Sequence, residues 1–203
     1  KNPLTPMKLS IQHLKRVVNS KDDKQKKIIT EFESKMIQQI DLLSEIANEF
    51  SNFADFPKAT MKKIDLTKVI KKTIDLYESN KNINIKFSYN ESEDFLIFGD
   101  VNQLTRVFTN LINNSIQAID NKGNIDIALK NKLTYVVIDV IDNGKGIPKE
   151  LRNHIFEPQF TTKSNGKGLG LPMVFQILLS HKGEIELIEN NHQGTCFKIH
   201  LPK

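Results

Sequence analysis

Asp142-Asn143-Gly144-Lys145-Gly146-Ile147-Pro148 directly follows a hydrophobic run, and Gly166-Lys167-Gly168-Leu169-Gly170-Leu171 comes later, at the predicted start of a helix. Each sequence alone is weak evidence, because Asp-Asn-Gly is a common turn and flexible loops are often rich in glycine. A glycine-rich turn at a helix N-terminus can, however, bind phosphate oxygens through its backbone N–H groups. No Cβ blocks the approach there, and the helix end carries partial positive charge. The pair therefore indicates a phosphate-binding site.

Further polar side chains extend this prediction to a nucleotide. Asn110 and Asn114 lie four residues apart on one face of a predicted helix, and asparagine carbonyls are ligands suited to a Mg²⁺ that bridges phosphates. Asp142, at the end of a strand, can accept a hydrogen bond from the exocyclic amine of adenine, and Lys163 and Lys167 can lie near phosphates as point charges. The sequence contains neither a P-loop signature nor the glycine-rich loop of protein kinases, so a different nucleotide-binding fold is required.

From residue 65 onward the chain alternates between helical and strand-like patterns. Helices are predicted over residues 66–77, 101–119 and 171–180, and strands over residues 83–89, 124–130, 133–141, 184–188 and 195–201. The buried side of the second helix is formed by Leu104, Val107, Phe108, Leu111, Ile112 and Ile116. This order predicts an α/β sandwich domain over residues 65–203.

Two apolar seams precede this domain. Leu4, Met7, Ile11, Leu14 and Val18 form the first, and Ile29, Phe32, Met36, Ile40, Leu43, Ala47, Phe50 and Ala54 form the second, with a polar turn between them. Two such helices bury little surface alone, so we predict a helical hairpin over residues 1–56 that dimerises into a four-helix bundle. A monomeric hairpin that docks on the rest of the chain is the alternative. Residues 57–64 are predicted to be a linker, and the fold class is α+β.

Composition narrows the functional classes. The formal net charge is +5, but the lysines are spread along the chain and no basic-aromatic module occurs, so nucleic-acid binding is not predicted. The single cysteine, Cys196, excludes a disulfide framework and a Cys/His metal cluster, and it is expected to be a small buried side chain. No apolar run reaches membrane-spanning length. Because the chain starts abruptly at Lys1, we expect it to be part of a longer protein.

In order and spacing, residues 100–203 resemble the Bergerat-type ATPases, a superfamily that includes the ATPases of DNA gyrase, the mismatch-repair MutL proteins and histidine kinases. Asn110 and Asn114 match its N box; Asp142, Gly144 and Gly146 match G1; Phe156 and Phe160 match the F box of histidine kinases. Gly166, Gly168 and Gly170 match G2, and Gly194-Thr195 matches the closing Gly-Thr. The resemblance implies a Bergerat-type sandwich in which Asn114 holds Mg²⁺, Asp142 reads adenine, and the span between G1 and G2 is a mobile lid.

The resemblance implies a complete set of site residues. The catalytic residues would be Asn110, Asn2 and Lys163, and the metal ligand would be Asn114. ATP would be bound by Asn110, Asn114, Asp142, Gly144, Gly146, Ile147, Phe156, Phe160, Thr161, Thr162, Lys163, Gly166, Lys167, Gly168, Leu169, Gly170 and Thr195. The implied cofactors are ATP and Mg²⁺.

The stem is similar to that of sensor histidine kinases, in particular the nitrogen-regulation kinases of the NtrY type. Lys1-Asn2-Pro3-Leu4-Thr5-Pro6 looks like the end of their phosphoacceptor box, and residues 48–54 and the lid residues 160–163 are similar as well. The acceptor histidine would lie four residues before Asn2, and so before Lys1. His13, His154, His181, His192 and His200 are interpreted as surface or structural residues.

This likeness implies an autophosphorylating kinase that passes its phosphoryl group to an aspartate of a response-regulator receiver domain. Asn2 matches the polar residue that orients water when such kinases dephosphorylate their regulator, so a phosphatase role is also implied. The chain would be a cytoplasmic part of a homodimer, anchored in the bacterial inner membrane only through a region upstream.

Two alternatives remain. A clamp-type ATPase of the same superfamily would carry a glutamate as general base where this chain has Asn110, so activation of water has poor support. A nucleotide-gated dimerisation scaffold without kinase activity is the other alternative, and it belongs to a different functional class.

Overall fold

The structure is a computed structural model that describes residues 23–54, 58–161, 168–188 and 194–203. The chain divides into two units, Lys1–Phe56 and Pro57–Lys203. Each is described below by itself. Among the helices of the described ranges, none combines the length and the apolar composition that crossing a membrane requires.

The described part of the first unit is one helix, α2 (Asp23–Ala54), of 32 residues. Its apolar seam is unevenly covered, because Ile40 is 3% exposed whereas Phe32 and Leu43 are 61% and 50% exposed. The first predicted seam, from Leu4 to Val18, lies outside the described residues. The helical hairpin and the four-helix bundle therefore remain predictions.

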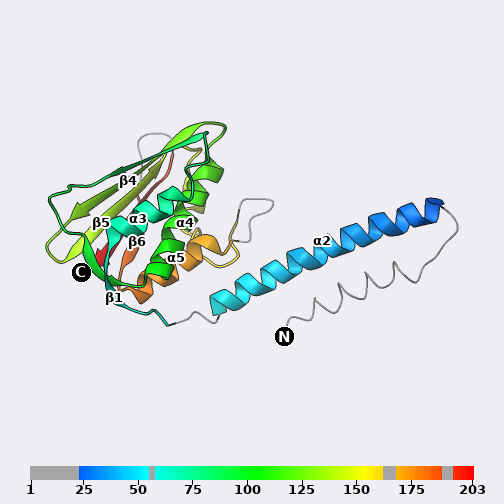
Figure 1. Ribbon diagram of the computed structural model, residues 1–203, viewed down its shortest axis with the longest axis horizontal. Helices are drawn as coiled ribbons and strands as arrows, with labels where there is room; N and C mark the ends of the chain where they lie inside the picture. Colours follow the sequence, from blue (N-terminus) through cyan, green and yellow to red (C-terminus); the bar gives the residue numbers. More distant parts are fainter. Residues whose placement is uncertain (1–22, 55–57, 162–167, 189–193) are drawn as a thin grey trace. The chain divides into compact units, whose positions relative to one another are not determined.

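The second unit is a layer of helices on a five-stranded sheet (Figure 1). The strands stand in the order β2-β4-β5-β7-β6; β2 and β4 are parallel, and all other neighbours are antiparallel. The strands are β2 (Ile83–Ser88), β4 (Gly123–Asn131), β5 (Tyr135–Asp142), β6 (Glu184–Ile188) and β7 (Cys196–Pro202). The helices are α3 (Leu66–Asp75), α4 (Val101–Ala118) and α5 (Gly170–Ser180), and a 3-10 turn, η1, covers Lys149–Leu151. The predicted α/β sandwich is thus confirmed.

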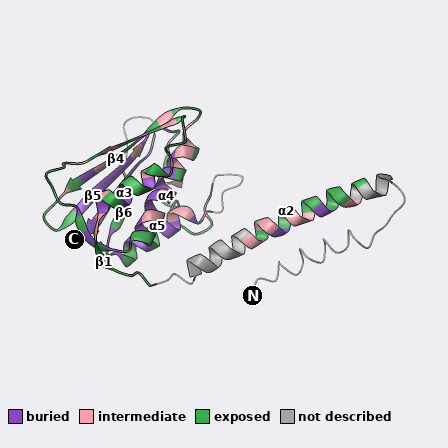
Figure 2. Cartoon of the chain, viewed as in Figure 1, coloured by how far each residue is buried: buried purple, intermediate pink, exposed green. Residues whose placement is uncertain are grey.

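The core lies between the helices and the sheet (Figure 2). Apolar residues spaced three and four apart put one stripe of α4 inside the core, and alternate residues of the central strands face this stripe. The side chains that are at most 5% exposed include Leu104, Val107, Phe108, Leu111 and Ile112 of α4, Ile125 and Ile127 of β4, Val136, Ile138 and Val140 of β5, and Val174 and Ile177 of α5. Cys196 is buried, as expected.

Two short strands are absent from the sequence-based prediction. β1 (Lys62–Asp65) pairs antiparallel with β3 (Leu96–Gly99), and Lys62 lies opposite Gly99. The predicted linker over residues 57–64 overlaps this strand, which begins at Lys62. Four-residue strands are too short to show a period, and their pairing joins segments more than thirty residues apart.

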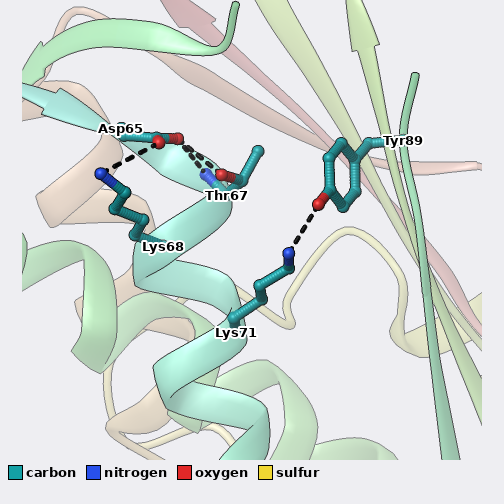
Figure 3. Close-up of polar contacts among 5 residues, drawn as sticks. All are labelled: Asp65, Thr67, Lys68, Lys71 and Tyr89. Carbon is teal, nitrogen blue, oxygen red and sulfur yellow. Dashed lines mark hydrogen bonds and ion pairs between the residues drawn. The ribbon is translucent and has the colours of Figure 1, made fainter. Parts of the chain in front are cut away.

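Asp65 ends β1 and begins α3 (Figure 3). Its Oδ1 accepts hydrogen bonds from the backbone N–H of Thr67 at 3.0 Å and from the Thr67 hydroxyl at 2.6 Å, which makes Asp65 the N-cap of α3. One turn further along, Lys71 Nζ donates to the Tyr89 hydroxyl at 2.6 Å, and this hydrogen bond raises the pKa of Lys71. The two contacts fix the start of α3 and join the helix to the segment after β2.

Asp100 caps α4 and connects it to the segment before β1. Its Oδ1 accepts from the backbone N–H groups of Asn102 at 2.9 Å and Gln103 at 3.1 Å. Its Oδ2 accepts from the backbone N–H of Thr60 at 2.8 Å. One carboxylate thus satisfies three backbone donors, two of which the first turn of α4 would otherwise leave unpaired.

His181 joins the end of α5 to the start of α4. The ring is 1% exposed; its Nε2 accepts from the backbone N–H of Asp100 at 3.0 Å, and its Nδ1 donates to the Ile177 carbonyl at 2.8 Å. An acceptor at one nitrogen and a donor at the other correspond to the neutral imidazole. This contact set supports the interpretation of His181 as a structural residue.

Replacing Asp100 by alanine should lower the free energy of unfolding of the second unit by about 1–2 kcal/mol at pH 7, because the cap of α4 is lost. Urea unfolding followed by tyrosine fluorescence measures this unit alone, since the three tyrosines, at positions 77, 89 and 135, all lie in it. Burial raises the pKa of Asp100, but the N–H donors of Thr60, Gln103 and Asn102 lower it by more, so the net pKa is below its ordinary value. The stabilisation is therefore present above the unfolded-state pKa and is lost as the pH falls through the folded-state pKa.

The matched control is Asp100→Asn, since asparagine caps a helix about as well as aspartate but does not titrate. This variant should keep most of the stability at pH 7 and show a weaker dependence on acid pH. An equal loss of stability in both variants would contradict the capping role.

Candidate functional site

Asp142 is the last residue of β5, and its carboxylate is held by three donors while only 4% exposed. Oδ1 accepts from the backbone N–H groups of Gly144 at 3.0 Å and Thr195 at 3.1 Å. Oδ2 accepts from the hydroxyl of Ser115 at 2.9 Å. A carboxylate has about four acceptor positions, so one position on Oδ2 stays available after these bonds are counted. The buried group is therefore fixed in orientation and can accept one more donor.

Ser115 is the site residue that the sequence-based prediction lacks. It lies on α4 directly after Asn114, is 3% exposed, and reaches across to the end of β5 through its bond to Asp142. The sequence signal available was a hydroxyl in the middle of an otherwise apolar helix face, next to the asparagine pair. That signal is ambiguous, because serine in a helix often bonds to the carbonyl one turn earlier.

The loop after β5 lies close against two other segments. The backbone N–H of Lys145 donates to the carbonyl of Ala118 at 2.9 Å, and a Cβ on Gly144 would lie 2.7 Å from that same oxygen. Gly194 has φ 123°, and a Cβ there would lie 1.9 Å from the Asp142 carbonyl oxygen. Glycine is thus required at both positions by the close approach of backbone to backbone.

The N-terminus of α5 faces Asn110. A Cβ on Gly170 would lie 3.2 Å from Asn110 Oδ1, and the Asn110 amide donates to the Arg106 carbonyl at 2.9 Å. Leu169, the N-cap of α5, makes no side-chain capping bond. The first backbone N–H groups of this helix therefore have no side-chain acceptor at the cap, and such a helix end can bind phosphate.

The segment between the two glycine-rich sequences contains two phenylalanines whose rings contact other aromatic rings. The ring of Phe156 lies 5.8 Å from that of Phe175 on α5 and 6.3 Å from that of Phe197 on β7. Phe160 lies 5.9 Å from His154, whose Nδ1 is 2.9 Å from the Glu157 carboxylate. The backbone N–H of Gln159 donates to the Gly168 carbonyl at 3.0 Å, which ties this segment to the start of α5.

The structure brings together part of the predicted set. Residues linked by the contacts above are Asn110, Asp142, Gly144, Gly146, Phe156, Phe160, Gly168, Leu169, Gly170 and Thr195, with Gly146 packed against Gly194. Ile147 accepts from Arg152 Nε at 3.2 Å, Asn114 is half-buried on α4, and Thr161 is exposed. Asn2, Thr162, Lys163, Gly166 and Lys167 lie outside the described residues.

Side chains that could bind a divalent cation are scarce in the described part of the chain. Within that part, no group of three or more His, Cys, Asp or Glu side chains has the geometry of a metal site. The half-buried amide of Asn114 lies beside Ser115, the partner of Asp142, and one turn after Asn110, which faces the start of α5. One hard amide oxygen would suit Mg²⁺, which usually keeps several waters and takes its other ligands from phosphates.

Known proteins are similar to this chain in sequence and fold. Residues 99–203 match the family described as histidine kinase-, DNA gyrase B-, and HSP90-like ATPase. Sporulation kinase C of Bacillus subtilis is 33% identical over 205 residues, which is 100% of this chain and 46% of that protein. Nitrogen regulation protein NtrY of Azorhizobium caulinodans is 32% identical over 194 residues, which is 92% of this chain and 25% of that protein. The chain thus spans less than half the length of these relatives.

The solved catalytic domain of histidine kinase ThkA has 33% sequence identity and a TM-score of 0.65, and the match covers 70% of this chain and 95% of that one. The same kinase is also solved in complex with the response regulator TrrA. That match, at 24% identity and a TM-score of 0.70, covers 99% of this chain and 58% of the other, and it bears on the fold alone. The predicted likeness to sensor histidine kinases, including those of the NtrY type, is confirmed by these matches. The chain belongs to the family of histidine kinase-, DNA gyrase B- and HSP90-like ATPases, and residues 99–203 form an ATP-binding domain similar to the catalytic domains of histidine kinases.

Proposed function

We propose that Asp142 reads the adenine of ATP. The observation that carries this assignment is the set of three donors on a buried carboxylate, which leaves one acceptor position on Oδ2. An exocyclic amine can fill that position, whereas a carbonyl at the same place would face the carboxylate with like partial charge. The site therefore favours adenine over guanine, and Ser115 keeps the carboxylate in the required orientation.

The phosphates would lie at the start of α5. Its first N–H groups have no side-chain cap, and Asn110 lies against Gly170 at this helix end. Asn114 is the proposed Mg²⁺ ligand, and Mg²⁺ supplies charge neutralisation for phosphoryl transfer when it is bound. The proposed lid residues Thr161, Thr162 and Lys163, together with Gly166 and Lys167, would complete the contacts with the phosphates. Phe156 and Phe160 would shape the wall of the site beside them.

Replacing Asp142 by asparagine should weaken ATP binding about tenfold to a hundredfold, because a hydrogen bond to a charged group is worth about 1.5–3 kcal/mol. The asparagine oxygen can still accept from Gly144 and Thr195, and its amide can donate to Ser115, so the loop should keep its conformation. Calorimetry with ATP and with purine riboside triphosphate, which lacks the amine, distinguishes a direct hydrogen bond to adenine from an indirect effect through the loop. The native chain should prefer ATP, and the variant should not; equal losses for both nucleotides would show that Asp142 acts only through the loop.

Replacing Asn114 by alanine should remove the part of the ATP affinity that depends on Mg²⁺. Titrations with Mg²⁺ and with a chelator measure that part directly. Asn113→Ala is the matched control, because it deletes the neighbouring amide of α4, which accepts from Tyr77 at 3.0 Å. Its Mg²⁺ dependence should equal that of the native chain. An Asn114 variant with the native Mg²⁺ dependence would disprove the metal assignment.

We further propose that the whole protein is a homodimeric sensor kinase that phosphorylates a histidine four residues before Asn2 and then an aspartate of a response regulator. The 33% identity with sporulation kinase C over the full chain supports this proposal. In the proposed step the neutral imidazole attacks the γ-phosphorus, a P–N bond forms, and the P–O bond to ADP breaks. Residues 1–56 would form the dimer, and Lys163 would lie near the γ-phosphoryl group during its transfer. In a phosphatase reaction, Asn2 would orient the attacking water. The domain would lie in the cytoplasm, with any membrane anchor upstream.

The test of this proposal uses this chain and a longer protein that includes the preceding sequence, each incubated with Mg²⁺ and γ-labelled ATP. Acid-labile, alkali-stable label should appear on the longer protein alone, because phosphohistidine has that stability and its site precedes Lys1. The same longer protein with glutamine in place of that histidine is the control and should stay unlabelled. If the longer protein binds ATP but takes no label, a scaffold or a purely phosphatase role becomes the better account.

A further inference from the structure

A pocket lies beside the loop that follows Asp142. It has a volume of about 450 Å³ and is lined by residues 80–84, residues 122–124 and Asn143. These segments are the turn before β2 with the start of that strand, the last turn residue before β4 with the start of that strand, and the first loop residue after β5. The pocket is an open depression on the surface, and most of its lining residues, among them Lys81, Lys122 and Asn143, are exposed. Asp142 itself does not line it, so the pocket adjoins the proposed adenine site without being part of it.

Asparagine amides give this pocket an excess of hydrogen-bond donors. Asn80 Oδ1 accepts from the backbone N–H of Asn82 at 3.1 Å, and Asn143 Oδ1 accepts from the backbone N–H of Asn124 at 2.9 Å. Asn124 Oδ1 accepts from the amide of Asn84 at 3.3 Å. A backbone N–H requires an oxygen opposite it, so the first two side chains have a defined orientation. Their oxygens are engaged, and the Nδ2 groups of Asn80, Asn124 and Asn143 make no hydrogen bond to the described residues.

The charged residues of the pocket are all positive. Lys81 and Lys122 are the only charged residues among its lining residues, and neither forms an ion pair within the ranges that the structure describes. Two ammonium groups and three amide donors match a ligand with several closely spaced anionic oxygens. No aromatic residue lines the pocket, so the stacking that single-stranded nucleic acid requires is missing.

We propose that this pocket binds a small phosphate-bearing molecule, held by Lys81, Lys122 and the amides of Asn80, Asn124 and Asn143. A phosphate presents several acceptor oxygens at one centre, which suits a pocket whose donors come from three segments. Asn143 directly follows Asp142, so an occupant would contact the loop that carries the proposed adenine-reading carboxylate. The site is distinct from the proposed ATP site, because its lining residues include none of the residues assigned to ATP.

The test is a titration of the full chain with pyrophosphate at low ionic strength, read at the side-chain amide resonances of Asn80, Asn124 and Asn143. The titration should shift these resonances to saturation, and Lys81→Gln/Lys122→Gln should weaken this binding at least about tenfold, since charge-assisted hydrogen bonds are lost. The matched control is Lys86→Gln/Lys132→Gln, which removes the same charge from exposed positions outside the pocket. It should keep nearly the native affinity.

Three outcomes would overturn the proposal. Absence of shifts at the three asparagines would show that pyrophosphate does not enter the pocket. An equal loss of pyrophosphate affinity in both double variants would show that binding depends only on the overall charge of +5. If citrate saturated the same resonances with the same affinity as pyrophosphate, the phosphate assignment would be wrong. Binding at the ATP site is separated by repeating the titration with ATP at saturation, under which the shift at Asn80 should persist.

Discussion

The architecture of the site depends on one buried carboxylate. Asp142 receives hydrogen bonds from α4 through Ser115, from its own loop through Gly144, and from the start of β7 through Thr195. Burying a charge without such partners costs several kcal/mol, so these segments must meet at this point. The close approach in turn requires glycine at positions 144 and 194, where a Cβ would collide with backbone atoms. A single constraint thus explains the contact of α4 with the end of the central strand β5, the two glycines and the orientation of the proposed adenine reader.

Helix α4 carries this constraint to the rest of the unit. Its C-terminal half holds Ser115, and its N-terminus is fixed by Asp100, which accepts from Thr60 and donates to His181 at the end of α5. The two helices that would enclose a nucleotide are therefore joined at one end by a buried imidazole. At the other end, Asn110 meets Gly170. Because α4 is fixed at both ends, its asparagines have a defined position relative to the start of α5.

Sequence reasoning succeeded where a signal is local. The helical and strand-like spacing of apolar residues predicted the helices and the strands of the main sheet, with bounds correct to within a few residues. The glycine-rich sequences located the loops around Asp142. Sequence reasoning failed where an element forms only by contact with a segment that is distant in the sequence. β1 and β3 are four residues each, and their strand character follows only from their pairing with one another. Ser115 was missed for the same reason, since a serine in a helix gains its role only from the aspartate that folding brings opposite it.

The asparagine at position 110 bears on the choice between kinase and ATPase. Its amide donates to the Arg106 carbonyl in its own helix, and its oxygen is directed toward Gly170. An amide cannot take a proton from water at neutral pH, whereas a carboxylate at this position could act as a general base. A phosphoryl acceptor with its own nucleophilic lone pair, such as a neutral imidazole, needs no such base at position 110. Asn110 therefore disfavours hydrolysis of ATP by water but is compatible with transfer of the phosphoryl group to histidine. The absence of a carboxylate at this position thus favours the proposed kinase over a clamp-type ATPase.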